Sequence, residues 1–183
     1  MRLTAAIPVG AVLGGLAAQR WDYRFPTMAG LLLAAAGLLF MSQWEADIGD
    51  PSMSLHLAIA GLGFGLVIAP IALAATNSAK EEDMGTAAAV VTTMRMVGMT
   101  VGLAGLTAWG SGRFQNLVTE LHFPVPLPGE TVAQVEERVR LYEEGFTNAG
   151  TTLFNEFFLV AMGALLLALI PAAFMTWRGD KDS

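Results

Sequence analysis

The apolar positions along the chain fall into five long runs that are separated by short charged breaks. Each run is roughly 17 to 25 residues long, the length that an α-helix needs to cross a hydrocarbon layer about 30 Å thick. The runs cover residues 3–18, 26–44, 53–77, 86–110 and 151–177. The pattern predicts an all-α integral membrane protein, a bundle of five transmembrane helices, in which residues 111–150 form a long loop.

Composition supports a membrane location. Only 14% of the 183 residues are charged and 54% are hydrophobic, whereas a soluble domain averages about 25% charged residues. Five apolar helices would leave a soluble chain of this length too little polar sequence to cover them. The sequence contains no cysteine, which excludes disulfides and thiolate chemistry. The lipid bilayer is the expected environment, and no cofactor, metal ion or nucleic acid is expected as a ligand.

The first run is not typical of a signal peptide, because it is too long, contains Pro8 and precedes four further runs. It begins at residue 3 without a preceding loop. We therefore expect the chain to belong to a larger architecture, and a truncated product is an open alternative.

Basic residues in the short breaks predict the orientation, because short loops with Lys and Arg tend to remain in the cytoplasm. Arg20 and Arg24 lie in the first break and Lys80 in the third, and Arg178 and Lys181 lie in the tail. The N-terminus is therefore expected outside a cell (plasma or inner) membrane and the C-terminus in the cytoplasm.

The predicted outer loop has two parts. Residues 123–129 carry three prolines, and the stretch 131–146 places apolar residues at helical spacing. Thr131 and Gln134 have the spacing of a capping box. A short amphipathic helix is expected at the outer interface or folded over the spans, and a solvated connecting helix is the alternative.

Small residues four positions apart mark helix faces that can pack closely in lipid. Such pairs are Gly10 and Gly14, Gly61 and Gly65, and Gly98 and Gly102. They predict packing faces, which could also slide during a transport cycle. Pro70 removes a backbone hydrogen bond inside the third run and predicts a bend there. This run is the expected gating helix.

Arg95 is the charged residue well inside a predicted span. It lies about 14 Å from the start of its helix, and a lipid-facing arginine near the bilayer centre costs about 2.5 to 3.5 kcal/mol. We expect it to line a substrate or ion pathway; a structural ion pair, a carbonyl clamp or snorkelling toward the inner surface is the alternative. A helical projection places a set of mostly small or polar residues on its side: Ala88, Thr92, Gly98, Met99 and Gly102.

Other polar residues in or near the spans are weaker candidates. Thr92, Thr93, Met99 and Asn77 are candidates for the pathway beside Arg95. Glu156 and His56 could carry protons, although each is more simply read as a polar residue at the outer boundary.

The first break resembles the cytoplasmic signature of the major facilitator superfamily, G-x-L-A-D-R-x-G-R-R. The matching residues are Gly15, Ala18, Arg20 and Arg24, whereas Gln19 replaces the acid and Asp22 the second glycine. The glycine-rich segment 61–70, the segment 85–102 and the long loop before the last helix add to the likeness. Together they resemble the carboxyl-terminal part of the fourteen-helix drug:proton antiporter branch.

The resemblance implies that the chain supplies the last five core helices of such a fold. The first, third and fourth spans would flank the central pathway. The implied function is proton-coupled efflux of an amphipathic or drug-like small molecule by alternating access, with Arg20 and Arg24 stabilising an inner-side conformation. A second chain could supply the missing amino-terminal helices.

Two classes of protein other than transporters also contain long apolar helices. A non-transporting membrane module, or a gene fragment that packs against a partner membrane protein, fits the same pattern. An intramembrane enzyme does not, because the spans hold no paired acids, no histidine cluster and no His-Glu-x-x-His pattern.

Overall fold

The computed structural model describes residues 2–175 as five α-helices and one short 3-10 helix. Trp177, Arg178 and Lys181, which entered the predicted last span and tail, lie outside the described residues. The elements are α1 (Arg2–Arg20), α2 (Arg24–Met41), α3 (Ser52–Asn77), η1 (Glu81–Asp83), α4 (Met84–Val118) and α5 (Val132–Ala173). The fold is an all-α helical membrane bundle, as predicted.

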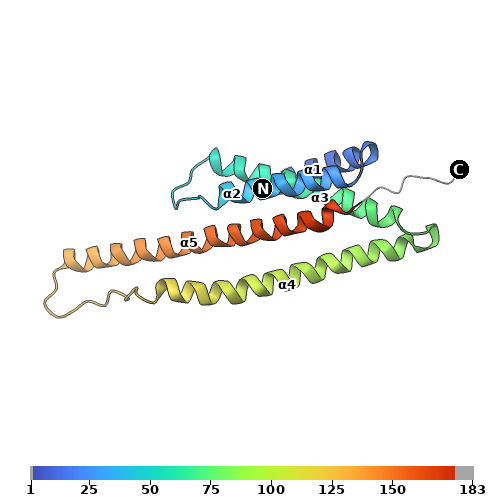
Figure 1. Ribbon diagram of the computed structural model, residues 1–183. Coiled ribbons are helices and arrows are strands. Elements are labelled where there is room, and N and C mark those ends of the chain that lie inside the picture. The colour runs from blue at the N-terminus through green and yellow to red at the C-terminus, as the bar shows by residue number, and fades with distance from the viewer. Residues whose placement is uncertain (1, 176–183) are drawn as a thin grey trace.

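Helix α3 lies at the centre of the compact part of the bundle. It packs against α1 on one side and α2 on the other, α2 packs in turn against α5, and α5 packs against α4 (Figure 1). Leu38, Met41 and Ala60 form a small buried core where α2, α3 and α5 meet.

Glycines allow the helices of this compact part to approach closely. A Cβ atom on Gly14 would lie 2.6 Å from the carbonyl oxygen of Leu66 on α3, and one on Gly63 would lie 2.7 Å from the Cα of Ala34 on α2. Gly10 and Gly65 meet in the same way between α1 and α3. Backbone contact of this kind is how helices attract one another in lipid.

Helix α4 lacks such contacts along most of its length. A Cβ atom on Gly98 or Gly102 would meet nothing within 4 Å. Gly110 is the buried residue of α4, and none of its most apolar 18-residue window is buried. The small-residue pair on α4 is therefore unoccupied by any helix of the described chain.

Four helical segments within the described residues are long and apolar enough to span a membrane: Arg24–Met41, Ser52–Asn77, Glu81–Val118 and Val132–Ala173. The first predicted span, residues 3–18, corresponds to α1, a helix of 19 residues that packs against α3 but is not among the four. Where the bilayer boundaries fall along these helices stays a prediction.

The segment 111–150 differs from its prediction. Helix α4 continues to Val118, and α5 begins at Val132 and runs without interruption for 42 residues, about 63 Å. The expected separate amphipathic helix is the first part of α5, because the sequence between Thr131 and the apolar run holds single glycines but no proline to end a helix. Thr131 and Gln134 do form the predicted capping box.

The two long helices form a hairpin that extends well beyond the loop between α2 and α3 (Figure 1). We call residues 111–150 the hairpin extension. Aromatic residues in the first part of α5 pack against α4 and the segment after it: Phe146 meets Phe114 of α4 at 5.5 Å between ring centroids, and Tyr142 meets Phe123 at 5.6 Å.

Candidate functional site

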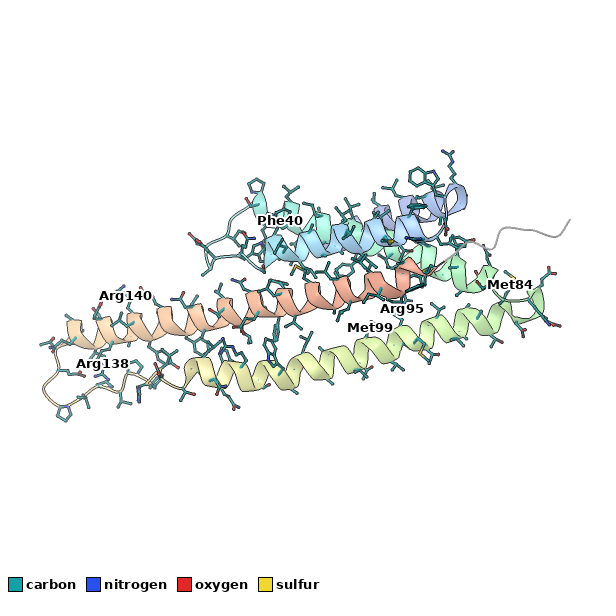
Figure 2. The ribbon with its side chains drawn as sticks, viewed as in Figure 1. Phe40, Met84, Arg95, Met99, Arg138 and Arg140 are labelled. Atoms are coloured by element: carbon teal, nitrogen blue, oxygen red, sulfur yellow. The ribbon has the colours of Figure 1, made fainter. Side chains whose placement is uncertain are left out.

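The predicted pathway residues of the fourth span lie together on an exposed part of α4. Arg95 and Met99 are one turn apart on this helix, and Met99 is 60% exposed (Figure 2). The Thr92 and Thr93 hydroxyls donate hydrogen bonds to the carbonyl oxygens one turn earlier, at 3.0 and 2.9 Å. The helix thus satisfies both hydroxyls itself, and their oxygens remain able to accept a further hydrogen bond.

Arg95 has no ion pair or hydrogen bond from its side chain within residues 2–175. The side chain is exposed. A guanidinium is costly to expose to lipid, so the prediction that Arg95 lies within the bilayer also predicts a protein or water surface beside it that residues 2–175 do not supply.

A shallow groove of about 570 Å³ continues along α4 from Met99 toward the hairpin extension. Its lining comes from α4 alone and is mixed in character: Met99, Thr100, Leu103, Ala104, Thr107, Ala108 and Ser111. This surface has one wall only, so it becomes an enclosed pathway only if other helices cover it.

Asn77 lies away from Arg95, at the end of the bundle that carries residues 15–24, which we call the signature loop. Its side-chain amide donates a 2.6 Å hydrogen bond to the Tyr23 hydroxyl. Tyr23 is buried and its carbonyl oxygen accepts a 2.7 Å hydrogen bond from Thr27. The structure therefore groups Asn77 with the signature loop instead of the predicted pathway residues.

The signature loop itself encloses a pocket of about 390 Å³. Arg20 and Arg24 are exposed, and the backbone N–H of Arg24 donates to the Asp22 carboxylate at 3.3 Å. Gly15 faces Ala69 of α3 at contact distance. The lining consists of Ala18, Gln19, Arg20, Trp21, Asp22, Tyr23, Leu73 and Asn77.

Glu156 has a partner that the sequence reading missed. The Arg113 side chain donates two hydrogen bonds to its carboxylate, from Nε at 2.8 Å and from Nη2 at 2.6 Å, and so joins α4 to α5. The signal was present, because both residues flank the connection between the fourth and fifth apolar runs and would meet in a helical hairpin. Next to this pair, the Phe157 ring packs on Gly110, and the ring centroids of Phe157 and Trp109 are 5.6 Å apart.

His56 lies in an aromatic stack at the other end of α3. The Trp44 indole N–H donates a 3.0 Å hydrogen bond to its Nδ1, and the Phe40 ring stacks on it at 5.2 Å. Since an indole nitrogen can only donate, Nδ1 acts as an acceptor in this arrangement. The Asn155 amide donates to the Trp44 carbonyl oxygen at 2.9 Å, which joins α5 to the same loop.

The predicted gating residues are part of the compact core. Pro70, Gly61 and Gly65 are buried, and α3 continues as one helix through Pro70. Their counterparts on α4, Gly98 and Gly102, face open space. The structure thus divides the predicted set into packed positions on α3 and unpacked positions on α4.

The turn of the hairpin extension is held by charged groups. Arg138 forms a 2.5 Å ion pair with Glu130, and the Leu127 backbone N–H donates to the same carboxylate at 2.8 Å. The Leu127 hydrogen bond and then Arg138 hold the pKa of Glu130 below its ordinary value. Arg140 on α5 lies between Glu137 and Glu144, far from Arg95 on α4 (Figure 2).

Within residues 2–175, no group of three or more His, Cys, Asp or Glu side chains gathers closely enough to hold a metal ion.

Comparison with known proteins gives a consistent set of relatives. A triacylglyceride transporter of Mycolicibacterium hassiacum is 35% identical over 194 aligned positions, which cover 98% of this chain and 36% of that protein. A probable triacylglyceride transporter of Mycobacterium leprae is 36% identical over 91% of this chain and 35% of its own length. The triacylglyceride transporter of Mycobacterium tuberculosis is 35% identical over 90% of this chain and 34% of its own length.

No family model matches the sequence. The chain spans about a third of the length of the curated relatives it matches. It is therefore a multi-pass helical membrane protein that is similar, over nearly all of its length, to part of mycobacterial proteins named as triacylglyceride transporters.

Proposed function

We propose that the chain is the carboxyl-terminal part of a membrane transporter that exports a lipid-like or otherwise amphipathic solute. The observation that carries the proposal is the exposure of α4. This helix is long enough to span a membrane and carries the guanidinium of Arg95 and the small-residue pair Gly98 and Gly102. Other helices of the described residues cover almost none of it. Relatives about three times as long provide room for the helices that would cover it.

In the proposed arrangement, additional helices complete a cavity around the exposed face of α4. Arg95, Thr92, Thr93 and Met99 would then line the pathway. The guanidinium can donate to ester or other carbonyl oxygens, while Met99 adapts to apolar parts of varied shape. This combination suits a solute with a polar head and apolar chains better than a small ion.

The names of the relatives favour lipid over a small drug as the solute class. Triacylglycerides are large and almost wholly apolar, so their removal from a bilayer requires an apolar path with few polar contacts. The groove along α4 supports this in part, since its lining includes apolar Met99, Leu103 and Ala104, together with three hydroxyls that could contact the ester oxygens.

Alternating access is the proposed mechanism: the compact part of the bundle and the missing helices would rock against each other around the pathway. Pro70, Gly61 and Gly65 would permit bending within α3, and Gly98 and Gly102 would form the sliding face on α4. Proton movement down its gradient would drive export. Glu156 and His56 remain candidates for the proton step, and each would first have to release the partner described above.

The proposed orientation follows the basic residues of the short loops. The end with the signature loop, Lys80 and the C-terminus would face the cytoplasm, and the hairpin extension would project outside the cell membrane. Arg20 and Arg24 would there contact the missing half in an inner-side conformation.

A non-transporting module is the second candidate, because α1, α3, α2 and α5 pack into a bundle without help from another chain. The two candidates are separated by co-purification from the native membrane in mild detergent. A stoichiometric partner that supplies membrane helices supports transport. A lone chain that shows no proton-dependent lipid flux in vesicles supports the module.

Arg95 provides the sharper test in the assembled protein. Arg95→Ala is expected to insert into the membrane as well as the parent but to reduce flux of a fluorescent triacylglyceride in proton-loaded vesicles by tenfold or more, about 1.4 kcal/mol. Arg140→Ala, which removes an exposed arginine from the hairpin extension, is the matched control and should transport normally. Full activity in Arg95→Ala would remove Arg95 from the pathway.

A further inference from the structure

A second pocket lies between the α2–α3 loop and α5, about 320 Å³ in volume. Its lining is aromatic with one carboxylate: Trp44, Glu45, Thr151, Phe154, Asn155 and Phe158. The volume is within the range of small-molecule sites, about 300 to 1,000 Å³. None of these residues belongs to the proposed pathway on α4.

The aromatic walls are fixed in place. Trp44 meets Phe158 edge to face, with ring centroids 5.7 Å apart. The indole N–H of Trp44 donates a hydrogen bond to His56, and the backbone carbonyl oxygen of Trp44 accepts one from Asn155. The Trp44 ring therefore lines the pocket with its polar atom already hydrogen-bonded. Phe154 also lines the pocket and is 61% exposed.

The charges around the pocket leave it negative. Glu45 has no ion pair with a basic side chain of the described residues. On α5, Glu156 is paired with Arg113, whereas Arg140 is shared by two carboxylates, those of Glu137 and Glu144, so that acids outnumber bases there. Residues 44–48 carry two acids, Glu45 and Asp47, and no base. The local potential therefore attracts cations.

We propose that this pocket binds a small organic cation, an alkylammonium group, among the rings of Trp44, Phe154 and Phe158 and beside the carboxylate of Glu45. Aromatic rings attract ammonium groups through their quadrupoles, and cages of such rings are how proteins recognise quaternary ammonium. A neighbouring carboxylate adds the charge that distinguishes a cation from an uncharged apolar group. The site goes beyond the proposed function and does not depend on transport.

Two sources could supply this chemistry: a soluble alkylammonium compound, or the choline headgroup of a lipid at the membrane surface. Both share the trimethylammonium group. Tetramethylammonium chloride is therefore the probe, and bilayer composition distinguishes the sources.

The experiment uses the full chain in bilayers of phosphatidylglycerol, with the nitrogen-15 resonance of the Trp44 indole as the readout. Trp44→Phe assigns that resonance. Titration with tetramethylammonium chloride should shift it saturably, with a dissociation constant on the order of millimolar. Sodium chloride at the same ionic strength should not, and the Trp109 resonance should remain in place.

Variants locate the binding. Glu45→Gln and Phe154→Leu should each raise the dissociation constant by about threefold or more. Asp47→Asn is the matched control, since it removes one carboxylate from the same loop but from a residue outside the pocket lining. It should leave the dissociation constant within about twofold.

Three results would overturn the proposal: a shift that does not saturate, an equal response to the uncharged isostere 3,3-dimethylbutan-1-ol, or an unchanged dissociation constant in Glu45→Gln. The isostere result would identify these rings as an ordinary interfacial aromatic belt. In bilayers of phosphatidylcholine, a raised apparent constant assigns the site to lipid headgroups, and an unchanged one assigns it to a soluble cation.

Discussion

The side chains of Arg113 and Glu156 hold the two long helices, α4 and α5, together. Their side chains are 40% and 26% exposed, and the two hydrogen bonds between them use the planar fork of the guanidinium. A bidentate pair of this kind fixes both the distance and the rotation of one helix relative to the other. The Phe157 ring on Gly110 lies directly beside it and would follow any change.

Replacing Arg113 with Met should therefore separate α4 from α5 near this pair. The expected loss of helix-pairing free energy is modest, because solvent screens a pair that is partly exposed. Hydrogen exchange should rise at residues 110–116 and 153–159 and not in α1. Arg113→Lys retains the charge without the fork and should be intermediate. Equal protection in all three proteins would show that the ring contacts alone hold the hairpin.

Glu130 gives the turn of the hairpin extension a dependence on acid. Its pKa is lowered in the folded state from the ordinary value of 4.5, so its contribution is fully present above that value and is lost as the pH falls through the folded-state pKa. Hydrogen-exchange protection factors at residues 123–138 should fall progressively as the pH drops below 4.5. Glu130→Gln should remove this step, and a turn that loosens identically in the variant would contradict the assignment.

Among the helices, the sequence predicts the features that depend on the local pattern of residues. It misses the features that depend on contacts between one helix and another. The apolar runs and the Thr131–Gln134 capping box led directly to helices and to a helix start. The division of residues 111–150 was mispredicted, because a polar stretch can equally form a loop or continue a helix that another helix stabilises. Phe114 and Phe146 decide this, and their contact is invisible until both helices are placed.

The site was predictable to a similar degree. Arg95 stands out by charge in an apolar run, whatever the fold. The hydrogen bond from Asn77 to Tyr23 spans 54 positions, and the pair of Arg113 with Glu156 spans 43. Such partners are set by how helices pack, which the pattern of one helix does not contain.

Helix packing makes the glycines of α3 and α4 respond differently to the same substitution. A methyl group on Gly63 meets the backbone of Ala34, so Gly63→Ala should lower the free energy of unfolding by about 1 to 3 kcal/mol. Gly98→Ala places the methyl group in open space and should be neutral or stabilising by up to about 1 kcal/mol in this chain. Reversible unfolding in mixed detergent measures both, and equal effects would mean that α4 is covered in the isolated chain.

At the scale of the whole molecule, the hairpin extension makes the two ends of the bundle unlike. One end is short and carries the signature loop, and the other projects beyond the α2–α3 loop (Figure 1). The basic residues Arg20, Arg24 and Lys80 lie at the short end. Because short basic loops remain in the cytoplasm, this asymmetry predicts that the extension is outside.

The absence of cysteine from the sequence allows a direct test of this orientation. Val125 is 60% exposed at the hairpin turn, and Ser78 is exposed at the short end. An impermeant maleimide added to intact cells should label Val125→Cys at once and Ser78→Cys only after the membrane is opened. The reverse pattern would invert the bundle, placing the extension in the cytoplasm and the signature loop outside. Labelling of both without opening would show that the chain does not form a sealed span between them.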